Sequence, residues 1–186
     1  MESLFSSLVS LERIFKQAGL ESIAIGALAL SVWGKARLTR DIDVKILLGR
    51  DEAARLVKAL PSDYVLLSDE PAQTLERLGM LFVRDPGGNR IDILLSDVEF
   101  DVSAVKRFRK VEVRPGVSAR FCSPEDLIIY KLISTRPQDH ADAESVIRRQ
   151  GNTIDEEYIL YWLKRFEQAL DDSTLLDKFR LMRQAG

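Results

Sequence analysis

Two aspartates separated by one residue are the first feature of this sequence that could do chemistry. Asp41 and Asp43 open the alternating run DIDVKILL, which places Asp41, Asp43 and Lys45 on one face of a strand and the apolar residues on the other. Two carboxylates so close on one face repel each other unless a cation neutralises them. A magnesium ion that carries phosphates would suit such a pair. The alternative is that salt bridges with Arg37, Arg40 or Lys45 neutralise both carboxylates.

A third carboxylate and a glycine fit the same hypothesis. Asp92 lies in the apolar run RIDILL, where a lone carboxylate is costly unless it is paired or binds a metal. Asp41, Asp43 and Asp92 could together hold two cations about 4 Å apart, and Asp92 could also act as a general base. Gly26 would let the backbone approach an anion at the start of a helix, although it could equally serve only a tight turn.

The composition removes several rival chemistries. Cys122 is the only cysteine and His140 the only histidine, which excludes an intrachain disulfide, a thiolate zinc cluster and a multi-histidine metal site. A Cys122–His140 nucleophile pair is the alternative, but Cys122 ends an apolar run, which is typical of a core residue. Oxygen ligands must therefore carry any metal chemistry, and they favour magnesium or manganese.

The bulk properties are those of a globular protein. Of the 186 residues, 46% are hydrophobic and 30% charged, and the net charge of −2 gives no global attraction to nucleic acid. No apolar run approaches the roughly 20 residues that span a bilayer, and the start of the chain lacks the basic segment of a signal peptide. We therefore expect a cytoplasmic protein without a membrane partner.

Hydrophobic periodicity predicts the elements that would position these residues. A first amphipathic helix carries Leu4, Leu8, Leu11 and Phe15 at helical spacing. The predicted strands cover 21–25, 41–48, 64–67, 80–83, 90–95, 110–113 and 117–122. The further predicted helices cover 27–33, 52–60, 71–78, part of 97–108, 127–134, 141–149, 154–170 and 173–182.

The order of these elements predicts an α+β fold in two parts. Residues 1–122 would form an α/β core with a mixed sheet, and residues 123–186 a helical region packed on it. Helix starts are expected at Asp51, at Ser123 and at the capping-box pair Thr153 and Glu156.

The stretch IGALALSVWGKARLTRDIDVKI resembles the signature of the DNA polymerase β-like nucleotidyltransferases, and most closely that of the abortive-infection (toxin–antitoxin) type. This resemblance implies a nucleotidyltransferase-type mixed β-sheet with flanking helices. The positions that match the signature are Gly26, Ala27, Gly34, Arg37, Thr39, Asp41 and Asp43, with Asp92 in the place of the third carboxylate.

A second stretch, SPEDLIIYKLISTRPQDHADAESVI, resembles the helical motif of the same family, so that the likeness covers about residues 22–147. Its matching polar positions are Lys131, Arg136, Asp139 and Asp142. Lys131 interrupts an apolar helix and could place its ammonium on a triphosphate, or it could simply extend to solvent. The other three follow a predicted helix end, where charges are usually solvated.

The resemblance implies a reaction and its partners. A nucleoside monophosphate would move from an NTP to a hydroxyl of a tRNA or protein acceptor, with Mg²⁺ or Mn²⁺ as cofactor, release of pyrophosphate and a cognate antitoxin as a partner. Asp41, Asp43, Asp92 and Lys131 would be catalytic, the three aspartates binding metal. The residues expected to bind the nucleotide are Gly26, Ala27, Arg37, Thr39, Arg40, Lys131 and Asp139.

Two alternatives remain open. The first is a small-molecule acceptor, as the antibiotic-modifying relatives use. Ala27 stands where the family has Gly or Ser, so it lacks a hydroxyl for the triphosphate, and a non-catalytic nucleotide-binding partner is the other alternative.

A local basic cluster surrounds Phe108. Its members are Lys106, Arg107, Arg109, Lys110, Arg114 and Arg120. The cluster could meet an RNA acceptor, with the ring available for stacking, or it could be the solvated charge of an edge strand.

Overall fold

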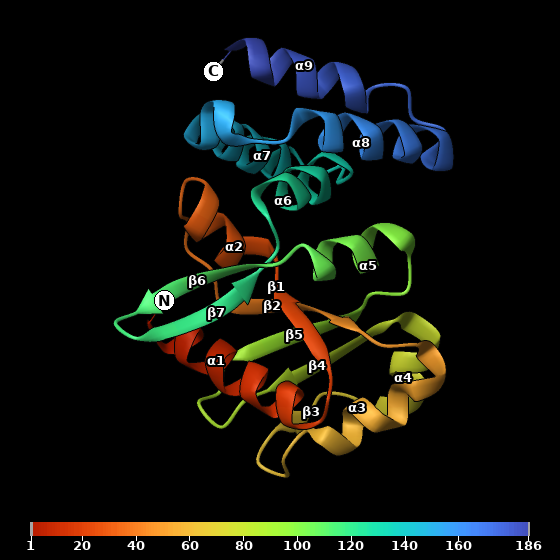
Figure 1. The fold of residues 1–186 in the computed structure, drawn as a ribbon. Coiled ribbons are helices and arrows are strands. Elements are labelled where there is room, and N and C mark those ends of the chain that lie inside the picture. Colours follow the sequence, from red (N-terminus) through yellow and green to blue (C-terminus); the bar gives the residue numbers. More distant parts are fainter. Residues whose placement is uncertain (1, 186) are drawn as a thin grey trace. The chain divides into compact units, whose positions relative to one another are not determined.

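The computed structural model describes residues 2–185, which divide into two compact units (Figure 1). Unit 1 comprises residues up to Leu28 and Leu38–Cys122, and unit 2 comprises Ala29–Arg37 and the residues from Ser123 onward. The helices of unit 1 are α1 (Glu2–Gln17), α3 (Ala53–Ala59), α4 (Pro71–Leu78) and α5 (Glu99–Lys106), while α2 (Gly26–Trp33) crosses the boundary. Those of unit 2 are α6 (Pro124–Leu132), α7 (Pro137–Gln150), α8 (Glu156–Leu170) and α9 (Leu175–Ala185).

Unit 1 is built on a seven-stranded mixed sheet in the order β3-β4-β5-β2-β1-β7-β6. Its strands are β1 (Glu21–Ala24), β2 (Asp41–Leu47), β3 (Val65–Leu66), β4 (Met80–Arg84), β5 (Arg90–Leu95), β6 (Arg109–Arg114) and β7 (Val117–Phe121). The pairs β2–β5 and β1–β7 are parallel and the other neighbours are antiparallel. The expected mixed sheet is confirmed.

The core of unit 1 lies on the apolar face of this sheet. Ile42, Val44 and Ile46 of β2 are fully buried, and α1 packs against β1, β2 and β7 through Leu8, Leu11 and Phe15. The alternation along β2 and β5 places their polar residues on the opposite face, where α5 approaches β2. The amphipathic patterns of α1 and β2 therefore decide which sheet face is covered and which is left for chemistry.

Unit 2 is helical, as the C-terminal half of the sequence predicts. Helix α6 begins with Ser123, whose Oγ accepts the Asp126 N–H at 3.1 Å while the Asp126 carboxylate accepts the Ser123 N–H, so the predicted start is a complete capping box. Nearly all of α6 is buried, and α7, α8 and α9 each contact it. The helix is therefore the centre of unit 2.

Three predicted helix starts are wrong. Asp51 caps no helix, because Arg50–Glu52 form a 3₁₀ turn and α3 starts after Glu52 without a side-chain cap. The cap of α8 is Asp155, which accepts the Tyr158 N–H, whereas the Thr153 hydroxyl donates to the Gln150 carbonyl. Helix α7 begins at Pro137 instead of residue 141, since proline is well suited to a first helical position.

None of the helices within residues 2–185 combines the length and the apolar character needed to cross a membrane. Cys122 is fully buried in the core, as its place at the end of an apolar run predicts.

Candidate active site

The three aspartates meet on one face of unit 1. Strands β2 and β5 are parallel neighbours, and their register pairs Asp43 with Asp92 and Asp41 with Arg90. Because side chains alternate along a strand, Asp41, Asp43 and Asp92 all project from the half-buried polar face. Two segments separated by about 50 residues of sequence thus bring three carboxylates to one patch of the sheet.

The turn after β1 is shaped around Asp43. The Ile25 N–H donates to the Asp43 carbonyl at 2.9 Å, and Gly26 follows with φ of +61°. A Cβ on Gly26 would lie only 2.0 Å from Oδ2 of Asp43. The carboxylate therefore occupies the volume that a side chain at position 26 would need, which ties the glycine of the motif directly to its second aspartate. Ala27, next in the chain, is buried.

Arg90 is a member of this site that the sequence analysis missed. Its Nε and Nη2 donate to the two carboxylate oxygens of Asp92 at 2.7 and 3.2 Å, and its guanidinium lies 4.8 Å from the Phe82 ring centroid. Hydrogen bonds and charge from Asp92 raise the pKa of Arg90, so the guanidinium stays ionised. The signal was present, because Arg90 lies two residues before Asp92 and must share its strand face.

The basic residues considered as alternative partners of the aspartates lie in different environments. Lys45 bridges to Asp101 of α5, a residue that is almost fully buried. Arg40 is exposed, and Thr39 contacts Asp41 only through the backbone, with Oγ1 donating to the Asp41 carbonyl at 3.2 Å. Thr39 therefore shapes the loop that leads into β2.

The donor set suits a hard divalent cation, but its arrangement is incomplete. Three carboxylates from two adjacent strands are the ligands that magnesium prefers. Within residues 2–185, however, no three carboxylate, histidine or cysteine side chains converge closely enough to form a metal site. Both oxygens of Asp92 are hydrogen-bonded by Arg90 instead. The residues therefore fit the cation in chemistry, and the guanidinium of Arg90 holds both oxygens of Asp92.

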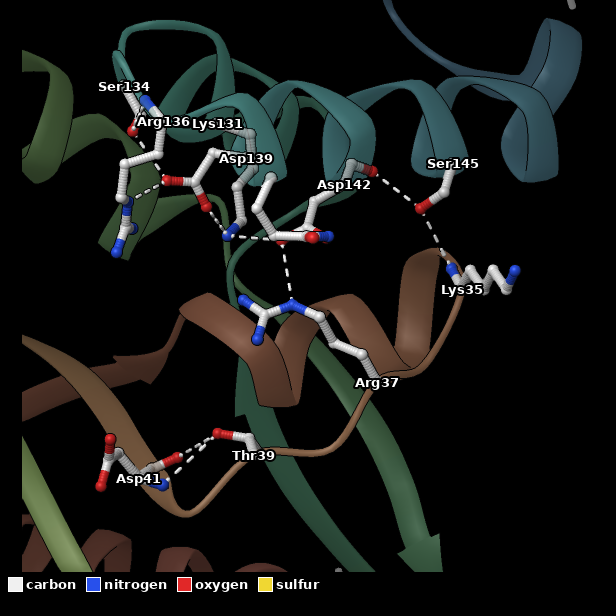
Figure 2. A network of polar contacts seen from close by, with 11 residues as sticks. Lys35, Arg37, Thr39, Asp41, Lys131, Ser134, Arg136, Asp139, Asp142 and Ser145 are labelled. Carbon is white, nitrogen blue, oxygen red and sulfur yellow. Dashed lines mark hydrogen bonds and ion pairs between the residues drawn. The ribbon is translucent and has the colours of Figure 1, made fainter.

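In unit 2, Lys131 belongs to a separate cluster of charges (Figure 2). The residue is 5% exposed, and its ammonium lies 2.5 Å from Oδ1 of Asp139 and 2.9 Å from Oδ2 of Asp142. Asp139 also accepts hydrogen bonds from Ser134 and Arg136 at 2.7 and 2.6 Å. The expectation that the two aspartates are solvated is wrong, because both are buried.

The positive and negative charges of this cluster stabilise one another. Burial opposes charge on Asp139, but hydrogen bonds from Lys131, Ser134 and Arg136 outweigh it and lower the pKa of the carboxyl below its ordinary value of 3.8. Lys131 therefore already has two carboxylate partners, and a phosphate would have to compete with them.

The segment 29–37 is held to α7 within unit 2. Arg37 Nε lies 3.3 Å from Oδ2 of Asp142, and the Lys35 N–H donates to Ser145 Oγ at 3.1 Å (Figure 2). A Cβ on Gly34 would lie 2.7 Å from Ser145 Oγ and 2.8 Å from Val146 Cγ2. The second glycine of the motif is thus explained by close packing of the chain on α7.

Comparison with known proteins agrees with this fold. Residues 2–150 match the family model DUF6036, described as "Nucleotidyltransferase of unknown function", whereas no curated protein matches the chain. An antigenic nucleotidyltransferase-like protein from Paracoccidioides brasiliensis is similar in structure, with a TM-score of 0.56 and 16% identity over 95% of this chain and 93% of that one. The lincosamide antibiotic adenylyltransferase LnuA, solved with lincomycin bound, has a TM-score of 0.51 and 13% identity over 78% of this chain and 96% of its own. The two structures support the fold, and the family match covers most of the sequence: the chain belongs to the DUF6036 family of nucleotidyltransferases.

Proposed function

We propose that this nucleotidyltransferase moves a nucleoside monophosphate from an NTP to an acceptor hydroxyl, with release of pyrophosphate, and that Asp41 and Asp43 are its essential carboxylates. The observation that supports this most directly is the fit between Gly26 and Asp43, because a Cβ at position 26 would lie 2.0 Å from the Asp43 carboxylate. A glycine is expected at a position where the backbone must approach both a carboxylate and an anionic substrate, because it has no side chain.

The site residues of unit 1 each have a role in this proposal. Asp41 and Asp43 would hold Mg²⁺ or Mn²⁺, and Asp92 would complete the ligand set or accept the proton of the attacking hydroxyl. The cation supplies charge neutralisation at the phosphoryl group that is transferred. Gly26 and Ala27 begin α2, and the first N–H groups of a helix lack intrahelical acceptors, so they suit phosphate oxygens.

The nucleotide contacts of the remaining motif residues stay predictions. Arg40 is exposed and its charge suits a phosphate, while Thr39 orders the loop beside it. Lys131 and Arg37 would contribute to triphosphate binding only by exchanging a carboxylate partner for a phosphate, and Asp139 would then act through Lys131.

The candidate functions that remain differ in the acceptor of the nucleotidyl group. The resemblance to abortive-infection toxins favours a tRNA or protein hydroxyl, a cognate antitoxin and a cytoplasmic reaction. The structural likeness to the lincosamide adenylyltransferase favours an antibiotic-like small molecule as the second candidate. A non-catalytic nucleotide-binding partner is the third, because Ala27 offers no hydroxyl to the triphosphate.

Transfer of label tests the proposal. The protein is incubated with each α-³²P-labelled NTP, Mg²⁺ and, in parallel, total tRNA, cell extract protein or lincomycin. We expect transfer to one acceptor class, lost in Asp41→Asn/Asp43→Asn and kept in Asp51→Asn/Asp63→Asn, which removes two exposed carboxylates from the same unit. NTP binding without transfer to any acceptor would contradict catalysis, and transfer that survives in the first double variant would contradict the site.

A further inference from the structure

Unit 1 contains a basic groove lined by residues of α1 and of the β6–β7 hairpin. These elements are labelled in Figure 1. The groove has a volume of about 640 Å³, and four basic and two acidic side chains line it. The basic residues are Arg13 and Lys16 of α1, Lys110 of β6 and Arg120 of β7. The acidic residues are Glu12 and Glu21.

Like charges are held together here at an energetic cost. Lys110 and Arg120 are direct cross-strand partners in the antiparallel pair β6–β7, so both side chains project from the same face. Like charges directly opposite each other destabilise a sheet. The charge of Arg120 acts on Glu12, a carboxylate of the groove, and Lys110 is exposed. An anion that entered the groove would relieve this repulsion.

The acidic side chains do little to neutralise the groove. Glu12 accepts the backbone N–H of Arg120 at 2.7 Å, and burial raises its pKa to about 7 against the hydrogen bond and charge of Arg120. Burial therefore favours the uncharged form of Glu12 and weakens its compensation of the basic side chains. Glu21 is exposed at the start of β1.

Phe108 adds a stacking surface to this charge. It lines the groove, and the guanidinium of Arg120 lies 4.3 Å from its ring centroid. Aromatic rings and arginine planes are the groups on which unpaired bases stack, while lysines follow the phosphates.

Protection of an edge strand explains these residues less well. β6 is the edge of the sheet, and lysine on an edge strand discourages aggregation, which would account for Lys110. Arg120 lies on β7, which is paired on both sides, and Lys16 lies on a helix. Both nonetheless line the same concave surface.

We propose that the basic groove binds a single-stranded nucleic acid, with Lys16, Lys110 and Arg120 on its phosphates and Phe108 with Arg120 against a base. Binding at this groove is independent of nucleotidyl transfer. Only the further step, in which the bound strand is the acceptor, rests on the proposed function.

Fluorescence anisotropy with a short fluorescein-labelled polyuridine tests the binding. We expect salt-dependent binding by the wild type. Lys110→Gln/Arg120→Gln should weaken it by about tenfold and lower the log–log salt slope by about 1.4, since each lost phosphate contact on a single strand accounts for about 0.7. The matched control is Lys106→Gln/Arg109→Gln, which removes two exposed charges from the same region outside the groove and should bind like the wild type. Thermal melts verify that both variants fold, and the first should melt no lower than the wild type because it relieves repulsion.

Three results would overturn the proposal. They are no binding by the wild type at low salt, equal weakening in the control double variant, and competition by polyglutamate as effective as competition by unlabelled RNA. The Asp41→Asn/Asp43→Asn variant separates the two proposals. If it loses label transfer but keeps polyuridine binding, both stand; wild-type binding without any transfer contradicts only the function, and transfer without polyuridine binding contradicts only the groove.

Discussion

At the scale of single residues, Gly26 and the carboxylate of Asp43 compete for one volume. Gly26→Ala should therefore do two kinds of damage. The positive φ costs about 1–2 kcal/mol of stability, and the new methyl group displaces the carboxylate that lies 2.0 Å from its position. We expect loss of both stability and Mn²⁺ binding, measured by urea unfolding and by electron paramagnetic resonance.

Gly116→Ala is the control for the backbone strain alone. Gly116 has φ of +71° in the β6–β7 turn, and a Cβ there meets no atom within 4 Å. It should lose about the same stability through φ and keep full cation binding. If Gly26→Ala matched it in both measurements, the steric link between the glycine and Asp43 would be wrong.

Arg90 should regulate the affinity of the site for cations. Its guanidinium satisfies both oxygens of Asp92, so a metal that uses Asp92 must first break a charge-assisted pair. Arg90→Gln should bind Mn²⁺ about tenfold more tightly, because such hydrogen bonds are worth about 1.5–3 kcal/mol. Isothermal titration calorimetry measures the change directly.

Arg84→Gln provides the electrostatic control for this experiment. Arg84 is the exposed cross-strand partner of Arg90 on β4, so its removal subtracts the same charge without touching Asp92. Equal tightening in both variants would show a general charge effect, and no tightening in Arg90→Gln would exclude Asp92 from the ligand set.

At the scale of elements, α6 and α7 are joined through Lys131. Lys131→Met removes the ammonium from two buried carboxylates, Asp139 and Asp142, and breaking such pairs costs about 3–5 kcal/mol. Urea unfolding should therefore show a large loss of stability. Arg136→Met, whose side chain is 77% exposed although it also contacts Asp139, should cost less than about 1 kcal/mol. If Lys131→Met weakened NTP binding but left stability unchanged, the phosphate role would prevail over the one argued from these contacts.

The same two helices illustrate what the sequence could and could not predict. The alternation of β2, the helix start at Ser123 and the amphipathic stripe of α1 are local patterns, and all three are confirmed. The sequence pattern predicts that α7 starts at residue 141, four residues after its observed start at Pro137. With the helix beginning at Pro137, Asp139 and Asp142 lie one turn apart on one face and reach Lys131, a contact that the shorter helix did not predict.

The sequence also predicts only part of the candidate site, for a similar reason. Asp41, Asp43 and Asp92 stand out because charge in an apolar strand is costly. Their meeting, however, depends on the parallel pairing of β2 with β5, which is a long-range contact that no local pattern encodes. Arg90 was missed because an arginine at the first position of a strand is usually solvated, whereas the register places it opposite Asp41 and its side chain contacts Asp92.

At the scale of the whole molecule, a near-neutral net charge conceals local concentrations of one sign. The net charge of −2 gives no reason to expect a polyanion partner, yet the basic groove gathers four basic side chains on one surface. Carboxylates gather in the same way on the polar face of β2 and β5. The net charge therefore excludes only a global attraction, and a polyanion site must be local, because binding depends on where charges lie and not on their sum.

Glu12 should make the stability of the protein depend on pH. Burial raises its pKa from 4.5 to about 7, so between these values the folded state binds more protons than the unfolded state. The resulting stabilisation is fully present below pH 4.5 and is lost as the pH rises through about 7; it is on the order of 3 kcal/mol. Glu12→Gln keeps an oxygen for the Arg120 N–H and removes the titration. Its free energy of unfolding in urea should exceed that of the wild type at about pH 8 and approach it at about pH 4.

Glu21→Gln is the control for this experiment, because it makes an equal change of charge at an exposed position of the same groove. If the free energies of unfolding of the wild type and of Glu12→Gln changed in parallel with pH, the buried titration of Glu12 would be refuted.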